Sequence, residues 1–339
     1  MSDAIYQDRC AFVGTPAWHG QGIVLDPQWC EGMTGEQMRT AFQAHAKMDY
    51  DVEKVGCQTI DGTTLPGVYA VIRTDDGSIV SGRKTVGEDF EIVQNSQAFK
   101  FFDPFLDSGR CKLEAAGVLA DGAKVWVLVR IDGAVGEVLP GDPVESFFLL
   151  AHAHDGTLAC NVGFTNTRVV CQNTLSAALG SSRLLKVKHT KNVRSALEMV
   201  QEITDMRLRQ FQATIEQMQA LTRAGCSDDT LKAYVRAVFT PAKVGQDDAA
   251  KTLIGKIQPL FESGRGTEIA GVKGTMWGAY NAVTEYLTHE RGHASKNAEA
   301  KRLESLWFGQ SAKLANMAFT TALEMAGNRP ANNALALLG

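Results

Sequence analysis

The histidines of this chain are the side chains with the widest possible chemistry. His152 and His154 alternate with apolar residues in LAHAHDG, so a strand would place both rings on one face, beside Asp155. A general base needs an orienting partner, and a closed metal site needs further ligands. No third ligand stands at a diagnostic spacing, so the pattern favours a polar sheet face. His19, in the glycine-rich WHGQG, is interpreted in the same way as a histidine hydrogen-bonded within a turn.

The cysteines show no spacing that predicts a metal or disulfide site. There are seven: Cys10, Cys30, Cys57, Cys111, Cys160, Cys171 and Cys226. None forms a CxxC pair, and an odd number without regular spacing fits a reducing cytoplasm. Cys171 lacks the base that a nucleophile requires, so we interpret it as a packed thiol on a strand. We therefore expect no catalytic residue, no metal and no cofactor.

A basic segment lies in the middle of the chain. Between Leu179 and Glu198 there is no carboxylate, and the cations of this basic segment are Arg183, Lys186, Lys188, Lys191 and Arg194. Such a run can follow the phosphates of a nucleic-acid strand, and Arg168 is predicted to join it. On the first group of strands, Arg73, Arg83 and Lys84 are further candidates. The alternative interpretation is a solvated linker that is basic without binding anything.

Length and composition limit the kinds of protein to which these residues can belong. The 339 residues suffice for two domains or one large mixed domain, and 45% apolar with 21% charged residues is ordinary for a soluble globular chain. No stretch predicts a transmembrane helix, and the polar start MSDAIYQDRC lacks the features of a secretory signal. We therefore expect a cytoplasmic protein without membrane contact. The net charge of −4 argues against an entirely basic nucleic-acid coat but permits a local basic patch.

The first half of the chain predicts β-hairpins. Asp-Gly pairs at 61–62, 76–77, 121–122 and 155–156 separate runs with strand character. Two helices accompany them, one capped by Thr34 and one over SQAFKFFDPFLDSG with a stripe of phenylalanines. This pattern predicts an α+β fold with a largely antiparallel sheet, built from hairpins in the N-terminal half.

The second half of the chain predicts helices. We expect a long helix from Asn192 to Arg223, a helix capped by Ser227 and a helix over 247–263. Trp277 opens the next helix, and a last one is expected over about 297–325. These elements divide the chain into four parts. They are an N-terminal arm (1–35), an α+β sheet domain (36–182), a helical region (183–326) and a mobile tail (327–339).

Four stretches of the chain resemble one family. They are PAWHGQG with Trp18 and His19, LAHAHDGTLACNVGFTNTRVVCQNTLSAAL with Asn173 and Thr174, WGAYNAVTEYLTHERG with Trp277 and Asn281, and WFGQSAKLANMAF. Over roughly residues 13–326 they are similar to the phage- and plasmid-related proteins grouped as domain of unknown function 932. The arm departs from the family pattern at Gln21. The resemblance implies an origin in a mobile element of a bacterial host and brings no established activity. Within the central stretch, Asn173 or Thr174 is expected to cap the following helix.

Hairpins that lead into a helix beside a basic segment also resemble the Rad52-like single-strand annealing proteins of phages, at the level of fold only. That analogy implies single-stranded DNA bound in a positively charged groove of a homo-oligomer. The first expectation is therefore a single-stranded-DNA binding or annealing protein that acts in recombination or replication. One alternative is a metal- or histidine-dependent enzyme acting on nucleotides or nucleic acid through His19, His152, His154 and Asp155. Another is an oligomeric structural or host-interaction protein.

Overall fold

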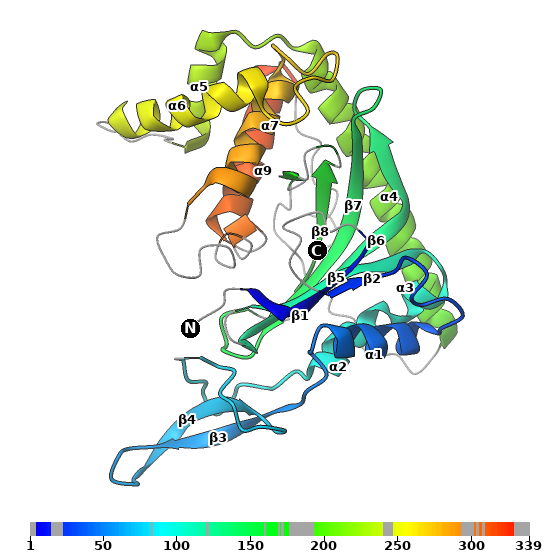
Figure 1. The fold of residues 1–339 in the computed structure, drawn as a ribbon, viewed down its shortest axis with the longest axis vertical. Helices are drawn as coiled ribbons and strands as arrows, with labels where there is room; N and C mark the ends of the chain where they lie inside the picture. Colours follow the sequence, from blue (N-terminus) through cyan, green and yellow to red (C-terminus); the bar gives the residue numbers. More distant parts are fainter. Residues whose placement is uncertain are drawn as a thin grey trace.

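A seven-stranded sheet forms the centre of the molecule in the computed structural model (Figure 1). The structure describes residues 5–14, 23–82, 84–119, 122–158, 161–168, 170, 173–175, 193–239, 247–292, 302, 305–306 and 309–328. The strand order is β2-β1-β5-β6-β7-β8-β9. The strands are β1 (Ile5–Val13), β2 (Ile23–Leu25), β5 (Cys111–Leu119), β6 (Lys124–Glu137), β7 (Pro143–Ala153), β8 (Asn161–Arg168) and β9 (Asn173–Leu175).

The sheet is built from consecutive hairpins, as the Asp-Gly turns predicted. β5 to β9 follow one another in antiparallel pairs, and β1 joins the other side of β5, also antiparallel. Only β2 lies parallel to its neighbour. β1 and β2 belong to the segment expected as an N-terminal arm, which therefore contributes strands to the sheet. The α+β class with a largely antiparallel sheet is confirmed.

A separate hairpin projects from one end of the molecule (Figure 1). It pairs β3 (Val52–Gln58) with β4 (Thr64–Arg73), which the turn at Gly62 predicted. The third strand expected after Gly77 forms only isolated bridges, at Ile79 and Val86. A small core of its own holds the hairpin base and consists of Tyr50, Val52, Val71, Val80 and Val86.

The helices beside the sheet confirm one predicted cap and correct one predicted helix. Thr34 and Gln37 form the expected capping box of α1 (Gly35–His45). The single helix expected after Ser96 is instead α2 (Asn95–Phe99), the 3₁₀ turn η1 (Lys100–Phe102) and α3 (Asp103–Asp107). Pro104 explains the break, because it has no N–H to continue the helical ladder and is tolerated only in a first turn. The predicted phenylalanine stripe (Phe99, Phe102 and Phe105) is buried.

The C-terminal half is helical, as predicted. α4 (Val193–Arg223) runs along the sheet, and a second group of helices packs beside its far end (Figure 1). The group contains α5 (Asp228–Phe239), α6 (Asp247–Ser263), α7 (Met276–Glu285), the π-helix η3 (Tyr286–Glu290) and α9 (Gln310–Met325). One continuous apolar core includes residues of the sheet and of these helices. The two halves therefore bury apolar surface against each other.

Candidate functional site

The predicted site residue Arg168 lies at the end of β8, inside the protein. Its Nε and Nη2 donate to the two carboxylate oxygens of Asp142, at 2.5 and 2.8 Å. Both side chains have no solvent exposure. This bidentate arrangement is the geometry in which a guanidinium and a carboxylate bind each other most specifically. It corrects the expectation that Arg168 joins an exposed set of phosphate-binding cations, because the guanidinium is buried and already paired.

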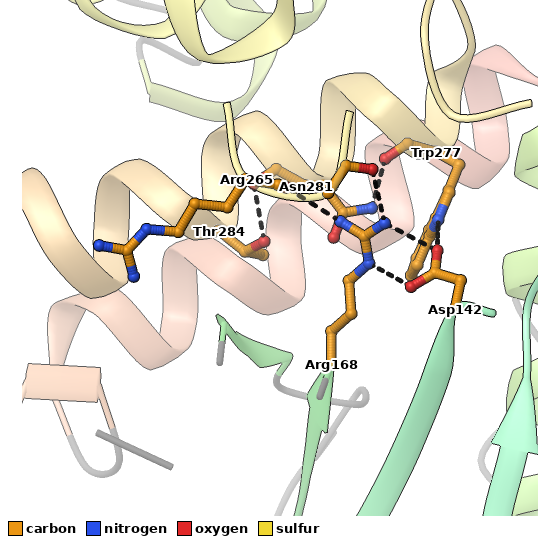
Figure 2. A network of polar contacts seen from close by, with 7 residues as sticks. Asp142, Arg168, Arg265, Trp277, Asn281 and Thr284 are labelled. Carbon is orange, nitrogen blue, oxygen red and sulfur yellow. Dashed lines mark hydrogen bonds and ion pairs between the residues drawn. The ribbon is translucent and has the colours of Figure 1, made fainter. Parts of the chain in front are cut away.

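Trp277 connects the same ion pair to the helical half (Figure 2). Its indole Nε1 donates to Asp142 Oδ2 at 2.9 Å, and its ring lies 5.6 Å from the Arg168 guanidinium. Asn281, one turn later on α7, donates to the Trp277 carbonyl at 2.8 Å. The two predicted residues Trp277 and Asn281 are therefore buried parts of one network, and Arg168 brings the central family motif into it.

The loop between α6 and α7 supplies further acceptors for the Arg168 guanidinium. Arg168 donates to the carbonyl oxygens of Arg265 at 3.4 Å and Gly266 at 3.2 Å. Gly266 has φ +76°, and a Cβ there would lie 2.7 Å from Arg168 Nη1. The glycine-rich loop is thus an interhelical connector, and Gly266 allows the close approach.

Glu285 fixes the start of the same loop. It accepts a hydrogen bond from the Arg265 backbone N–H at 3.0 Å, and its carboxylate lies 3.8 Å from Arg265 Nε. Burial raises the pKa of Glu285, and the Arg265 N–H and charge oppose that shift. The Arg265 side chain extends outward, with Nη1 3.4 Å from His289 Nε2. The whole arrangement anchors the loop and α7 to the sheet.

The two sheet histidines lie at the opposite end of β7. His152 and His154 are buried with their rings 4.8 Å apart, and His154 Nε2 lies 3.1 Å from Asn95 Oδ1. Burial lowers the pKa of His152 to about 3 and that of His154 to about 4, so both rings are neutral at pH 7. Within the described residues His152 Nε2 has no hydrogen-bond partner. We predicted that the two rings lie on one face of the strand. In the structure they do lie together, but that face is buried inside the protein.

Asp155 does not join the histidines as a ligand. It forms an ion pair with Lys84 at 3.2 Å and accepts hydrogen bonds from Thr157. Across the described ranges, no group of three or more His, Cys, Asp or Glu side chains is arranged to hold a metal ion. Lys84 and Arg73, two of the candidate cations on the first strands, are both paired, Arg73 with Asp75. Arg83 lies outside the described residues.

Several predicted residues fall in parts of the chain that the structure does not describe. These are Trp18 and His19 in the arm, and Arg183, Lys186, Lys188 and Lys191 of the basic segment. Arg194 is in the first turn of α4, and its side chain is among those not described. Asn173 and Thr174 are strand residues of β9, paired with Arg168 and Thr167. The expectation that one of them caps a helix is therefore wrong, because the β8–β9 pairing uses this stretch as sheet.

A second buried arginine, Arg207 of α4, was not among the residues predicted from the sequence. The residue is 5% exposed, and its guanidinium donates to Ser146 Oγ at 2.8 Å and to Asn166 Oδ1 at 2.9 Å. It also lies over the ring of Phe164, at 4.5 Å. No carboxylate of the described residues pairs with it, and burial alone lowers its pKa to about 10. The available signal was its place in the apolar stripe of α4, four residues before the buried Phe211.

The sheet, the helical half and the buried network that joins them define an α+β protein whose two halves share one core. Residues 83–307 match the family model described as Domain of unknown function (DUF932), so the chain belongs to that family. The match covers the Arg168, Trp277 and Arg207 positions alike. No curated protein and no solved structure matches the chain. Among the helices that the structure describes, none is long and apolar enough to cross a membrane.

Proposed function

We propose that this protein binds single-stranded DNA through the basic segment and promotes annealing in recombination or replication. The observation that carries the proposal is the run of five cations without a carboxylate between Leu179 and Glu198. In a chain of net charge −4, such a run concentrates positive potential in one place. Counterion release from phosphates then supplies the free energy of binding without reading base sequence.

The described elements on either side of the basic segment bear on this proposal. β9 ends at Leu175, and α4, which contains Arg194, begins at Val193. The first turn of α4 carries no acidic residue. Arg168 is no longer part of the proposed contact set, since it is buried against Asp142. The remaining members are the five cations of the basic segment.

The aromatic residues predict what kind of DNA binding to expect. Among the Phe, Tyr and Trp side chains whose burial the structure describes, none is exposed, so we expect little base stacking from them. Binding should then depend mainly on phosphate contacts. Five contacts at about 0.7 per phosphate give a slope of about −3.5 for log affinity against log salt.

The experiment is a fluorescence-anisotropy titration of a labelled single-stranded oligonucleotide at several salt concentrations. Lys186→Glu combined with Lys188→Glu should weaken binding strongly and lower the salt slope by about 1 or more. The matched control is Lys251→Glu with Lys256→Glu, the same charge change on the exposed surface of α6, which should bind like the wild type. Full binding by the first variant, or no binding of wild type at low salt, would sink the proposal.

The same proposal includes the setting in which the protein acts. A phage or plasmid origin, the cytoplasm of a bacterial host and assembly into homo-oligomers are parts of it, supported by the sequence resemblance and by the analogy to annealing proteins. Ring or filament assembly is tested by measuring the mass of the purified protein with and without oligonucleotide. A monomer in both conditions contradicts the assembly and leaves the DNA-binding test unaffected.

A further inference from the structure

The cluster of Arg207, Asn166 and Ser146 has donors without acceptors. Arg207 uses Nε and Nη2 on Ser146 and Asn166, and within the described residues nothing accepts from its Nη1. Asn166 is fully buried, and its Nδ2 has no partner there either. The amide orientation is fixed, because only Oδ1 can accept from the guanidinium. Two donors therefore flank the same hydrogen bond, and neither has an acceptor among the described residues.

The described residues also provide no carboxylate for the charge of this cluster. A buried guanidinium is normally paired with a carboxylate, since an isolated buried charge is strongly destabilising. Arg168, only two residues from Asn166 along β8, follows that rule through Asp142. Arg207 has instead two neutral acceptors and the face of Phe164. Of the two buried arginines, only Arg168 has an anionic partner among the described residues.

We propose that Arg207 and Asn166 form a binding site for a phosphate oxyanion. Arg207 Nη1 and Asn166 Nδ2 would donate to two oxygens of the anion, and the guanidinium supplies the countercharge. Phosphate oxygens suit such a pair of neighbouring donors. Arg207 is 5% exposed and Asn166 is fully buried, so the proposed site lies mostly below the surface.

The site lies where the basic segment leaves the sheet. Asn166 is the register partner of Leu175, which is the last residue of β9. Arg183, the first cation of the basic segment, is eight residues further along the chain. A phosphate of a bound strand would therefore be one source of the anion, and this source rests on the proposed function. Free inorganic phosphate is the other source and is independent of it.

The test uses the full chain and inorganic phosphate, compared with chloride at equal ionic strength. Phosphate should raise the thermal unfolding temperature of the wild type, because a ligand that binds only the folded state stabilises it. Arg207→Met should weaken phosphate binding about tenfold or more, the factor expected for loss of one charge-assisted hydrogen bond. Arg209→Met is the matched control, since Arg209 is exposed on the same helix and should leave the response unchanged.

A second variant guards against misfolding of the first. Asn166→Asp keeps the shape and places a carboxylate beside Arg207, so it should raise stability in chloride and abolish the phosphate response. An equal phosphate response in wild type, Arg207→Met and Asn166→Asp overturns the proposal, and so does a wild type without any phosphate response.

Oligonucleotide binding by the same variants separates the two sources. If Arg207→Met weakens both phosphate and oligonucleotide binding, the site holds a phosphate of the strand. If it weakens phosphate alone, the site holds free phosphate, and the basic segment is judged separately by the Lys186→Glu and Lys188→Glu variant. The two proposals can therefore fail independently.

Discussion

Trp277 donates its indole N–H to the Asp142 carboxylate across 135 residues of sequence, at 2.9 Å. The same carboxylate holds Arg168. One buried aspartate thus receives donors from the sheet and from the helical half. It links the two halves, which also share one apolar core. Arg168, which the sequence predicted to join the basic segment, instead lies where the sheet and the helical half are joined.

Removal of the Asp142 charge should destabilise the protein strongly. Asp142→Asn leaves the buried Arg168 without a countercharge, and breaking such a pair costs about 3–5 kcal/mol of unfolding free energy. Urea denaturation followed by circular dichroism measures it. The control is Asp229→Asn, which disrupts an exposed pair with Lys232 and should have no measurable effect. Equal midpoints for the two variants would contradict the assigned role.

Gly266 should be sensitive to a single methyl group because of Arg168. Gly266→Ala adds a Cβ at 2.7 Å from Arg168 Nη1, on backbone with φ +76°. Gly274→Ala is the matched control, since φ is +73° there and a Cβ meets nothing within 4 Å. The control measures the cost of the backbone conformation alone. Gly266→Ala should lower the free energy of unfolding by about 1–3 kcal/mol more than Gly274→Ala does. Denaturation midpoints that agree within error would show that the loop can move away from Arg168.

The buried histidines should make stability fall with acidification. The pKa values of His152 and His154 are lowered to about 3 and about 4, below the value near 6.5 expected in the unfolded chain. Between those limits the unfolded state binds more protons, so stability is complete above about pH 6.5 and is lost as pH falls through the folded pKa values. At about 1.4 kcal/mol per pKa unit, the full loss is on the order of 3–5 kcal/mol for each histidine.

His154→Gln measures this contribution as a difference from the wild type. Glutamine can still donate to Asn95, but it does not titrate, so the fall in unfolding temperature from pH 7 to 4 should be shallower. His45→Gln changes an exposed histidine and should reproduce the wild-type profile. Parallel pH profiles for His154→Gln and wild type would mean that the ring is not held neutral by burial.

Glu114 should act in the opposite direction. Its pKa is raised to about 7 by burial, against the attraction of Arg130. A raised pKa makes the charged form costly in the folded state, so this residue lowers stability as pH rises from about 4.5 towards 7. Glu114→Gln should therefore stabilise the protein at pH 8 by about 1–3 kcal/mol and have little effect at pH 4. A Glu114→Gln variant less stable than wild type at pH 8 would show that the ion pair with Arg130 dominates.

The sequence by itself determined the local elements of this protein. The Asp-Gly turns, the Thr34 capping box and the apolar stripe of α4 are short-range signals, because turn geometry, capping and helical periodicity involve residues that are near one another in the chain. The α+β class follows from them. The same signals predicted that His152 and His154 share one face, but they contain no information on whether a second layer covers that face.

Only the tertiary structure decided what the polar residues do. Arg168 and Arg207 are cations of the same type in the sequence, and only the helical spacing of Arg207 to Phe211 indicates that one of them faces the core. Asp142 lies 26 residues from Arg168, and Asn166 lies 41 residues from Arg207, so the pairs exist only after the sheet and helices have packed. Burial then fixes their roles, since the cost of a charge depends on the solvent and partners that the fold leaves around it.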